Sequence, residues 1–445
     1  GGRPAPRARA RRGMDVVINQ IHTLSTRNDS DLKKLKDYLR HEQETLKNNV
    51  QQIDQALQTL DLAQNALGIA FLLAAQFSAA VFQDQQQTFA YVGRFLAAAD
   101  ENQVKKALIP FVAVCRGYAQ MAVDAGQSAM LRSLVPLRSA VEKVQPSAEM
   151  LTPVHAEFLR VCLKAKAYHI GVRLLDQPIF NISMSSANCS QMTPQSFLCY
   201  FYYGAMLRVG MKQYHQAVQL LLVVLTCPAS CLSAIQVDAY KKYVLVSLRV
   251  YGELQPLPVY ASHIVQRCAK NAGYAAELAE AFKRGDPAAL QRILEEKGQA
   301  IEADSNMGLA RQAVDSLRRH KVRLLTNTYL TLSLVEIAKE IGLEESKTAE
   351  VETLLFDMIS EGEINARIDH ITGNVSFEDD QDDLDVGMVN KMQDKLHQIM
   401  DLAKRVSAFE QEVVSSQAYI RRSAALEGGG AGAVSALGSY DIMDM

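Results

Sequence analysis

The 445-residue chain contains no tryptophan, and aromatic residues make up only 7% of it. It also lacks the short motifs of common catalytic centres. A His-Glu-x-x-His zinc site, a Gly-x-Ser-x-Gly nucleophile elbow, a Gly-Lys-Ser/Thr phosphate loop and a dinucleotide-binding glycine fingerprint are all absent. No two of its nine histidines stand at metal-pair spacing. The sequence therefore predicts no catalytic residues, no metal and no cofactor, and we expect the protein not to be an enzyme.

Long apolar runs and paired cysteines are missing as well. The longest apolar stretch, residues 66–82, is interrupted by Gln76 and Ser78, which makes it too short and too polar for a membrane span. The seven cysteines are scattered through apolar contexts, and Cys227 and Cys231 have no second Cys or His pair at zinc spacing. We expect free buried thiols in a reducing compartment and a soluble intracellular protein without membrane contact.

The two ends differ from the rest of the chain. Residues 1–13 contain five arginines and no acid; without them the 47 cations become 42 against 49 acidic residues, so the remainder is mildly acidic. This basic leader is expected to be a disordered extension before Met14, with a localisation patch as the alternative. Residues 425–445 are rich in glycine and alanine, and we expect a disordered tail.

Residues 14–325 are dominated by helical periodicity. Within them YHIGVRLL (168–175) and YHQAVQLL (214–221) share five of eight residues at an offset of 46, a period typical of stacked helix pairs. Gly171 and Ala217 occupy the same place in both copies, where two helices could approach closely. The stretch LCYFYYGAML (198–207) could be an aromatic peptide-binding strip, but aromatic residues at this spacing more often form the repeat core. We predict a mainly α fold with a TPR-like helical-repeat solenoid.

Residues 326–380 have the pattern of a winged helix. Ser333 and Glu336 form a capping box, and Gly342 supplies a stop. A second helix, capped by Ser346, carries apolar residues at i, i+3, i+4, i+7 and i+8 until Gly362. Residues 364–369 and 374–377 then alternate as a hairpin. The sequence predicts helix, turn, helix and hairpin in that order.

The charge of this module disfavours nucleic acid. Its second helix, residues 346–361, has one cation against four acids, and the wing runs into an acidic stretch, whereas a helix in the major groove needs cations. The basic cluster at residues 318–323 precedes the module. It has no interleaved aromatic residues, so a solvated helix face is favoured over a nucleic-acid contact.

After an acidic linker at residues 381–387, residues 388–424 predict one long helix. Apolar residues spaced by threes and fours give it a narrow seam, broken at Glu410. This seam could fold back on the solenoid or join an intermolecular helix bundle, and the sequence leaves both open. The seam consists of Val389, Met392, Leu396, Ile399, Ala403, Val406 and Val413.

This order of parts resembles the PCI family, whose members are subunits of the proteasome lid, the COP9 signalosome and translation initiation factor 3. The match is to the signalosome branch and extends from Met14 to about residue 420, with the PCI helical part starting at about residue 197. It is carried by LCYFYYGAML (198–207), DAYKKYVLVSL (238–248), DSNMGLARQAV (304–314), TYLTLSLVEIA (328–338) and MISEGEINARIDHITGNVSF (358–377). The arginine leader and the glycine-rich tail depart from the pattern.

The resemblance implies a non-catalytic scaffold subunit. The signalosome removes NEDD8 from cullins and so regulates cullin-RING ubiquitin ligases, with its protease centre in another subunit. Partners would be other signalosome subunits, with subunits 1 and 8 as neighbours, in cytoplasm and nucleus. Alternatives are a proteasome-lid or initiation-factor subunit, or a nucleic-acid-binding PCI protein. In such assemblies winged-helix sheets join side by side and terminal helices form a bundle. The seam would be the bundle surface, and the hairpin would supply the sheet edge through Ile364, Ala366, Ile368, Asn374, Val375 and Phe377.

Overall fold

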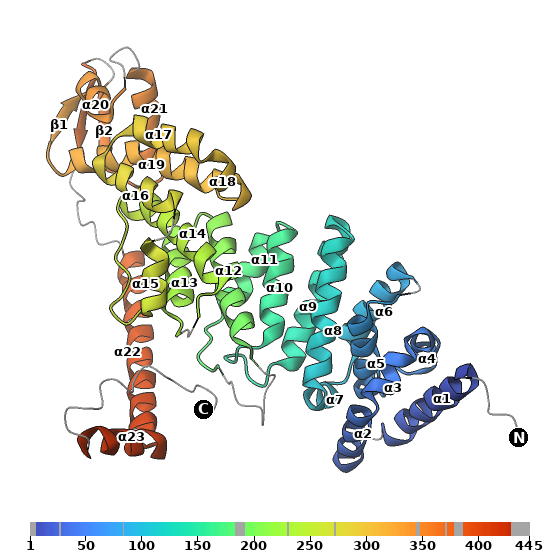
Figure 1. The fold of residues 1–445 in the computed structure, drawn as a ribbon. Coiled ribbons are helices and arrows are strands. Elements are labelled where there is room, and N and C mark those ends of the chain that lie inside the picture. Colours follow the sequence, from blue (N-terminus) through green and yellow to red (C-terminus); the bar gives the residue numbers. More distant parts are fainter. Residues whose placement is uncertain are drawn as a thin grey trace, which may run out of the picture. The chain divides into compact units, whose positions relative to one another are not determined.

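The computed structural model describes residues 6–25, 28–82, 84–182, 192–228, 231–270, 273–343, 348–369, 372–377 and 386–428 (Figure 1). It divides into two compact units, residues 1–320 and 321–445, which are described separately below. Residues 1–5 of the predicted leader, 381–385 of the predicted linker, 429–445 of the predicted tail and the proposed cap Ser346 lie outside the described residues. Residues 6–13, 386–387 and 425–428 are helical, so the predictions of a disordered leader, a linker and a disordered tail are wrong for these positions. The described part is mainly helical, and it confirms the predicted fold class of helical repeats, a winged helix and a long C-terminal helix.

Unit 1 is an array of helices, most of them joined by short turns, with longer connections before α12 and α15. Its helices are α1 (Pro6–Leu24), α2 (Asp29–His41), α3 (Gln43–Asn48), η1 (Val50–Gln52), α4 (Ile53–Thr59), α5 (Ala66–Ala79), α6 (Gln85–Ala98), α7 (Glu101–Lys106), α8 (Leu108–Asp124), α9 (Gln127–Val144), α10 (Pro153–Lys164), α11 (Tyr168–Leu175), α12 (Pro194–Gly210), α13 (Tyr214–Thr226), α14 (Ala234–Tyr251), α15 (His263–Lys270), α16 (Tyr274–Arg284), α17 (Pro287–Glu296) and α18 (Gly298–Ala303). The long helix α19 (Met307–Thr326) runs across the boundary into unit 2.

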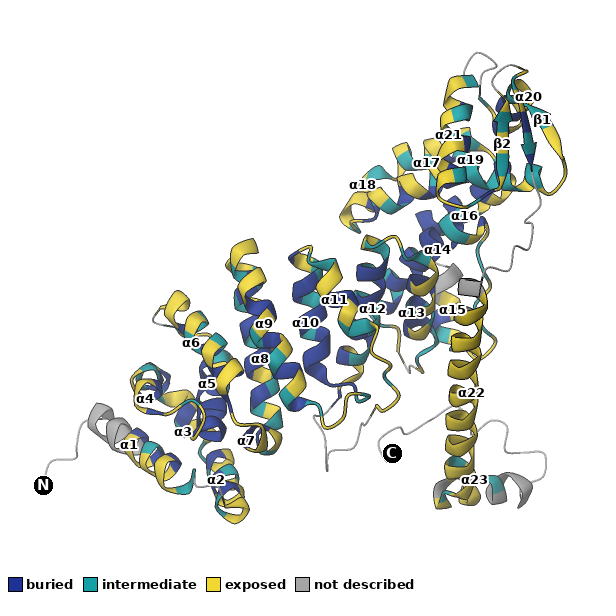
Figure 2. Ribbon diagram, turned by 180° about the vertical axis from the view of Figure 1, so that it is seen from behind, coloured by how far each residue is buried: buried dark blue, intermediate teal, exposed yellow. Residues whose placement is uncertain are grey.

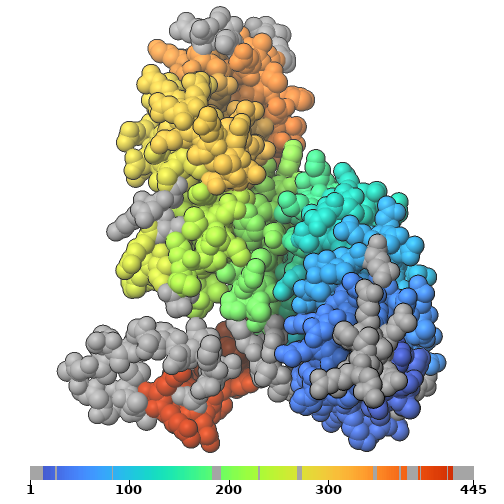
Figure 3. Space-filling view, turned by 45° about the vertical axis from the view of Figure 1, so that its right-hand side comes forward, coloured from blue at the N-terminus to red at the C-terminus, as the bar shows by residue number. Residues whose placement is uncertain are grey.

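Helices α8, α10 and α12 pack side by side, and α9, α11 and α13 connect them and pack against their flanks (Figure 1). Side chains fill the spaces between successive helices, so the array presents a continuous surface in the space-filling view (Figure 3). The apolar interior forms two contiguous clusters, and α12 contributes to both of them. The aromatic stretch 198–207 lies largely in this interior, where Tyr200 and Leu207 are buried. The core interpretation of that stretch is therefore confirmed for most of its residues.

The predicted repeat has the same turn before both of its copies. Lys166 (φ 58°) and Lys212 (φ 60°) adopt the left-handed conformation, two residues before α11 and α13 begin. In both turns the next residue's amide donates to the carbonyl five residues earlier, at 2.9 Å. A Cβ added at Gly171 would lie 2.6 Å from Leu207 Cδ1, and Ala217 is fully buried. The predicted close approach of helices is confirmed at Gly171, and Ala217 is buried at the equivalent position.

The winged helix of unit 2 forms around its own apolar cluster. Its elements are β1 (Thr331–Ser333), α20 (Leu334–Ile341), α21 (Thr348–Ser360), β2 (Ala366–Asp369) and β3 (Asn374–Phe377). The Ser333 capping box is confirmed: its hydroxyl accepts from the Glu336 amide at 3.2 Å, and its own amide donates to the Glu336 carboxylate at 3.2 Å. Gly342 (φ 83°) ends α20 and Gly362 (φ 70°) follows α21, as predicted.

The C-terminal segment forms two helices, α22 (Val386–Ser415) and α23 (Gln417–Gly428), where the sequence predicted one. The break falls at a pair of serines. The Ser415 hydroxyl donates to the Glu412 carbonyl at 3.0 Å, and the Ser416 hydroxyl donates to the Val413 carbonyl at 2.7 Å. Such side-chain bonds to the preceding turn weaken a helix locally, and here two of them stand side by side at the break.

Candidate assembly surfaces

The sheet of the winged helix has the strand order β1-β3-β2, and both pairings are antiparallel. β3 is therefore the central strand and has no free edge. The sequence prediction that both hairpin strands offer an edge is wrong for β3, because it missed β1. The two edges of the sheet belong to β1 and β2.

The hydrogen-bond pattern shows which backbone groups face outward. The Phe377 amide donates to the Leu330 carbonyl at 2.8 Å, so alternate residues of β3 face β1 and the others face β2. In β2, Arg367 and Asp369 then pair inward with β3, and the amides of Ala366 and Ile368 point away from the sheet. Among the described residues no strand pairs with this side of β2, which thus presents a backbone edge of the kind that a further strand can join.

The other edge is partly used. By the same alternation the Ser333 amide of β1 points away from β3, and it donates to the Glu336 carboxylate of the capping box. A strand added at β1 would have to displace this bond. β2 is therefore the better candidate for pairing with a neighbour.

The side chains predicted for the edge lie mostly in the module's own core. Val375 is fully buried and pairs with Leu332 on one side and Ile368 on the other. Only one of the six predicted residues is exposed, because inward-facing residues of a two-faced sheet pack on the helices. Ile364, Val375 and Phe377 are buried, Ala366 and Ile368 are half-buried against the same cluster, and Asn374 is exposed.

The seam on α22 is exposed along its described length (Figure 2). Six of the seven predicted residues are exposed, and Val413 is half-buried. Large apolar side chains at 46% to 66% exposure stand at Val389, Met392, Leu396, Ile399, Met400, Leu402, Val406, Phe409 and Val414. A contiguous apolar surface of this extent on one helix is typical of a helix–helix interface.

Four of these residues were missed by the sequence analysis: Met400, Leu402, Phe409 and Val414. Phe409 lies three residues after Val406 and four before Val413, so it carries the seam past Glu410, where the strict heptad breaks. A search for the 3.6-residue period instead of the heptad would have found it. The apolar surface is wider than the narrow seam that the sequence suggested.

Other kinds of site find little support in the described ranges. The residues of the basic cluster at 318–323 are half-buried or buried, and Arg323 forms an ion pair with Glu363 at 3.2 Å. Nowhere among the described side chains do three His, Cys, Asp or Glu residues gather as a metal site would require. Every helix in those ranges is too short or too polar to cross a bilayer.

Comparison with known proteins identifies the family. The family model for the N-terminal helical repeats of COP9 signalosome complex subunit 3 matches residues 29–265, which is more than half of the chain. The chain belongs to the COP9 signalosome complex subunit 3 family. A PCI domain model matches residues 290–379, which include α19 and the whole winged helix.

Curated members of the subunit 3 family align with almost the whole chain. COP9 signalosome complex subunit 3 of Arabidopsis thaliana is 32% identical over 411 residues, covering 92% of each chain. The Drosophila melanogaster protein of the same name is 28% identical over 425 residues, covering 92% of this chain and 94% of that protein. These alignments confirm the resemblance predicted from the sequence.

Proposed function

We propose that this chain is a non-catalytic scaffold subunit of the COP9 signalosome that joins its neighbours through the α22 face and the β2 edge. The observation that carries the proposal is the exposed apolar face of α22. Exposing that many Leu, Ile, Val, Met and Phe side chains is costly in water, and packing them against other helices removes the cost. Because the chain belongs to the subunit 3 family, we propose that these helices are terminal helices of other signalosome subunits.

The wider role follows from the assembly. As a scaffold, the chain would hold subunits 1 and 8 as its neighbours and contribute indirectly to the removal of NEDD8 from cullins, which regulates cullin-RING ligases. The protease centre would lie in another subunit, in line with the absence of catalytic motifs in the sequence. We place this function in cytoplasm and nucleus.

The first experiment tests the α22 face. The double variant Leu396→Asp, Ile399→Asp should weaken assembly with co-expressed signalosome subunits by at least about 100-fold. Burial of each side chain contributes roughly 1.5–3 kcal/mol, and each 1.4 kcal/mol is a factor of ten. Native mass spectrometry and titration by size-exclusion chromatography measure the loss. The matched control is Asn390→Asp, Ala408→Asp, which adds the same two charges to the same helix on the side opposite the apolar face.

Two outcomes would contradict the proposal. If the double variant assembles as well as the control, the α22 face is not the interface. If instead the isolated double variant loses its thermal unfolding transition while the control keeps it, α22 belongs to the protein's own core, and the exposed face must be abandoned as an interface.

A further inference from the structure

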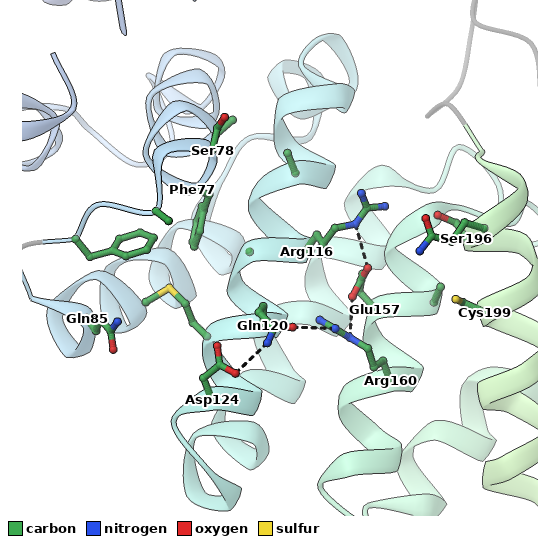
Figure 4. Close-up of a pocket in the computed structure, with 18 of the residues that line it drawn as sticks. Phe77, Ser78, Gln85, Arg116, Gln120, Asp124, Glu157, Arg160, Ser196 and Cys199 are labelled. Carbon is green, nitrogen blue, oxygen red and sulfur yellow. Dashed lines mark hydrogen bonds and ion pairs between the residues drawn. The ribbon is translucent and has the colours of Figure 1, made fainter. Parts of the chain in front are cut away.

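A cavity of about 750 Å³ opens on the layer formed by α5, α8, α10 and α12 in unit 1 (Figure 4). It lies far along the sequence from both assembly surfaces and has no part in the proposed scaffold contacts. Five helices (α5, α6, α8, α10 and α12) and the α5–α6 turn contribute to its lining. One half of the cavity is polar and charged, and the other half is apolar. This division suggests a ligand that has both characters.

The polar half contains a chain of five side chains from α8 and α10 (Figure 4). Arg116 Nε donates to Glu157 Oε1 at 3.2 Å, and Arg160 Nη1 donates to Gln120 Oε1 at 3.0 Å. Gln120 Nε2 in turn donates to Asp124 Oδ1 at 2.9 Å. The second oxygen of Glu157 lies 3.0 Å from Arg160 Nε. One glutamate is thus shared between two guanidinium groups.

Several donors in this chain remain available. Arg160 Nη2 is buried and has no hydrogen-bond partner, and the contact between Arg160 Nε and Glu157 is close but poorly aligned for a hydrogen bond. The Arg116 side chain lines the cavity, is 54% exposed and bonds to Glu157 only through its Nε, so its two terminal nitrogens are available to a ligand. A buried donor without an acceptor is costly, whereas a planar guanidinium binds a carboxylate through two parallel bonds. An incoming carboxylate would pair with the exposed Arg116 guanidinium, and the buried Arg160 guanidinium adds positive charge beside it.

The nearest other acid does not neutralise Arg116. Asp124 lies eight residues further along α8, which corresponds to roughly 12 Å along the helix axis, and it is held by Gln120. Glu157 faces two cations by itself. The end of the cavity beside Arg116 is therefore positively charged, and the end beside Asp124 is not.

The apolar half lies between α5 and α8. A Cβ on Gly117 would come within 2.4 Å of the Phe77 ring, so this ring lies directly on the backbone of α8. Phe82 packs edge-on against Phe77, with ring centroids 5.3 Å apart. Met121, one turn beyond Gly117, lines the same part of the cavity. Together these side chains make a pocket that suits one apolar side chain.

The remaining titratable groups at the cavity wall are neutral. Burial raises the pKa of the Cys199 thiol, and burial also raises the pKa of Tyr203 to about 12. Neither provides a thiolate or phenolate that would compete with an incoming anion or attack it. The cavity is equipped to bind a ligand and not to modify it.

We propose that this cavity binds an extended peptide that presents a carboxylate to Arg116, beside the buried Arg160, and an apolar side chain to the Phe77–Met121 pocket. Neighbouring helices lie roughly 8–10 Å apart, and an extended peptide advances about 3.3 Å per residue, so the two groups should stand two or three residues apart. The carboxylate comes either from an Asp or Glu side chain or from a C-terminus, since both offer the same two oxygens. This recognition site is independent of the α22 face.

The test measures binding of labelled six-residue peptides to the full chain by fluorescence anisotropy. Three peptides share a Phe-Ala-x core in a polar background. In the first, x is Glu and the C-terminus is amidated; in the second, x is Gln and the C-terminus is amidated; in the third, x is a C-terminal Gln with a free carboxylate. We expect the Glu peptide or the free-carboxylate peptide to bind at least tenfold more tightly than the amidated Gln peptide. Preference for one of these two identifies the source of the carboxylate.

Two variants link binding to the proposed residues. The Arg116→Gln variant should lose the preference for peptides with a carboxylate. The Met121→Gln variant should bind all three peptides more weakly, and to the same extent. The matched control is Arg138→Gln on α9, an arginine of similar exposure whose Nε also contacts a glutamate, at 3.3 Å, outside the cavity. Equal affinity for all three peptides, absence of binding by all of them, or a loss with Arg138→Gln as large as with Arg116→Gln would overturn the proposal.

Discussion

The contact between α5 and α8 yields a quantitative prediction at Gly117. Replacing Gly117 with alanine places a Cβ 2.4 Å and 2.5 Å from Cδ1 and Cγ of Phe77. These atoms lie near the base of a rigid ring that Phe82 also holds, so the helices themselves must move apart. Overpacking of this kind costs about 1–3 kcal/mol, while Gly→Ala in a helix gains up to about 1 kcal/mol. We expect a net loss of roughly 1–2 kcal/mol in the free energy of unfolding.

A second glycine separates the two contributions. Gly308 in α19 is exposed and has no atom within 4 Å of its would-be Cβ, so Gly308→Ala should be neutral or slightly stabilising. Urea unfolding of both variants, followed by circular dichroism, measures the difference between them. If the Gly117→Ala variant proves as stable as the Gly308→Ala variant, the helices of this array tolerate overpacking, and the close α5–α8 approach does not set their spacing.

Two further predictions concern a buried histidine and the sheet edge. Burial lowers the pKa of His155 from 6.5 to about 4, so the stabilising effect of the neutral ring is fully present above pH 6.5 and is lost as the pH falls toward 4. The urea midpoint of the His155→Gln variant should therefore fall less steeply with acid, while its amide can still pair with Thr152 as in a capping box. Identical pH profiles for the two proteins would refute this prediction. The Ala366→Pro variant loses one outward amide at the start of β2 and keeps every bond to β3. Native mass spectrometry should show the loss of one neighbouring subunit, while the thermal midpoint of the chain stays unchanged. Unchanged assembly would refute the proposed role of the β2 edge in assembly.

The helices of the winged helix were predictable from sequence because their determinants are local. A serine followed three residues later by a glutamate, an apolar period and a terminal glycine together specify α20. The strand order was not predictable, because β1 has only three residues and pairs with residues more than 40 positions later. Which strand is an edge depends on this long-range pairing, so the side chains named for the edge proved to be core.

The cavity could not be found in the sequence at all. Its lining comes from residues between 74 and 203, on five helices and one turn, and the pattern of each helix shows only that it packs against neighbours. Tyr203 belongs to the aromatic stretch whose peptide-binding interpretation was set aside, and it does line the cavity. The helical period of the sequence predicts that Tyr203 is partly buried. Its position beside Arg160 depends on how the helices of the array stack, which the sequence pattern does not show.

The left-handed turns at Lys166 and Lys212 have a mechanical consequence. Each turn fixes the direction of the next helix through one backbone torsion, and each following helix pair inherits that direction. Curvature in such an array is a sum of small rotations, so an error of a few degrees at Lys166 is carried by every later helix of the array. Within unit 1, the position of the last helices relative to the first ones therefore depends strongly on the torsion angles of a few turns.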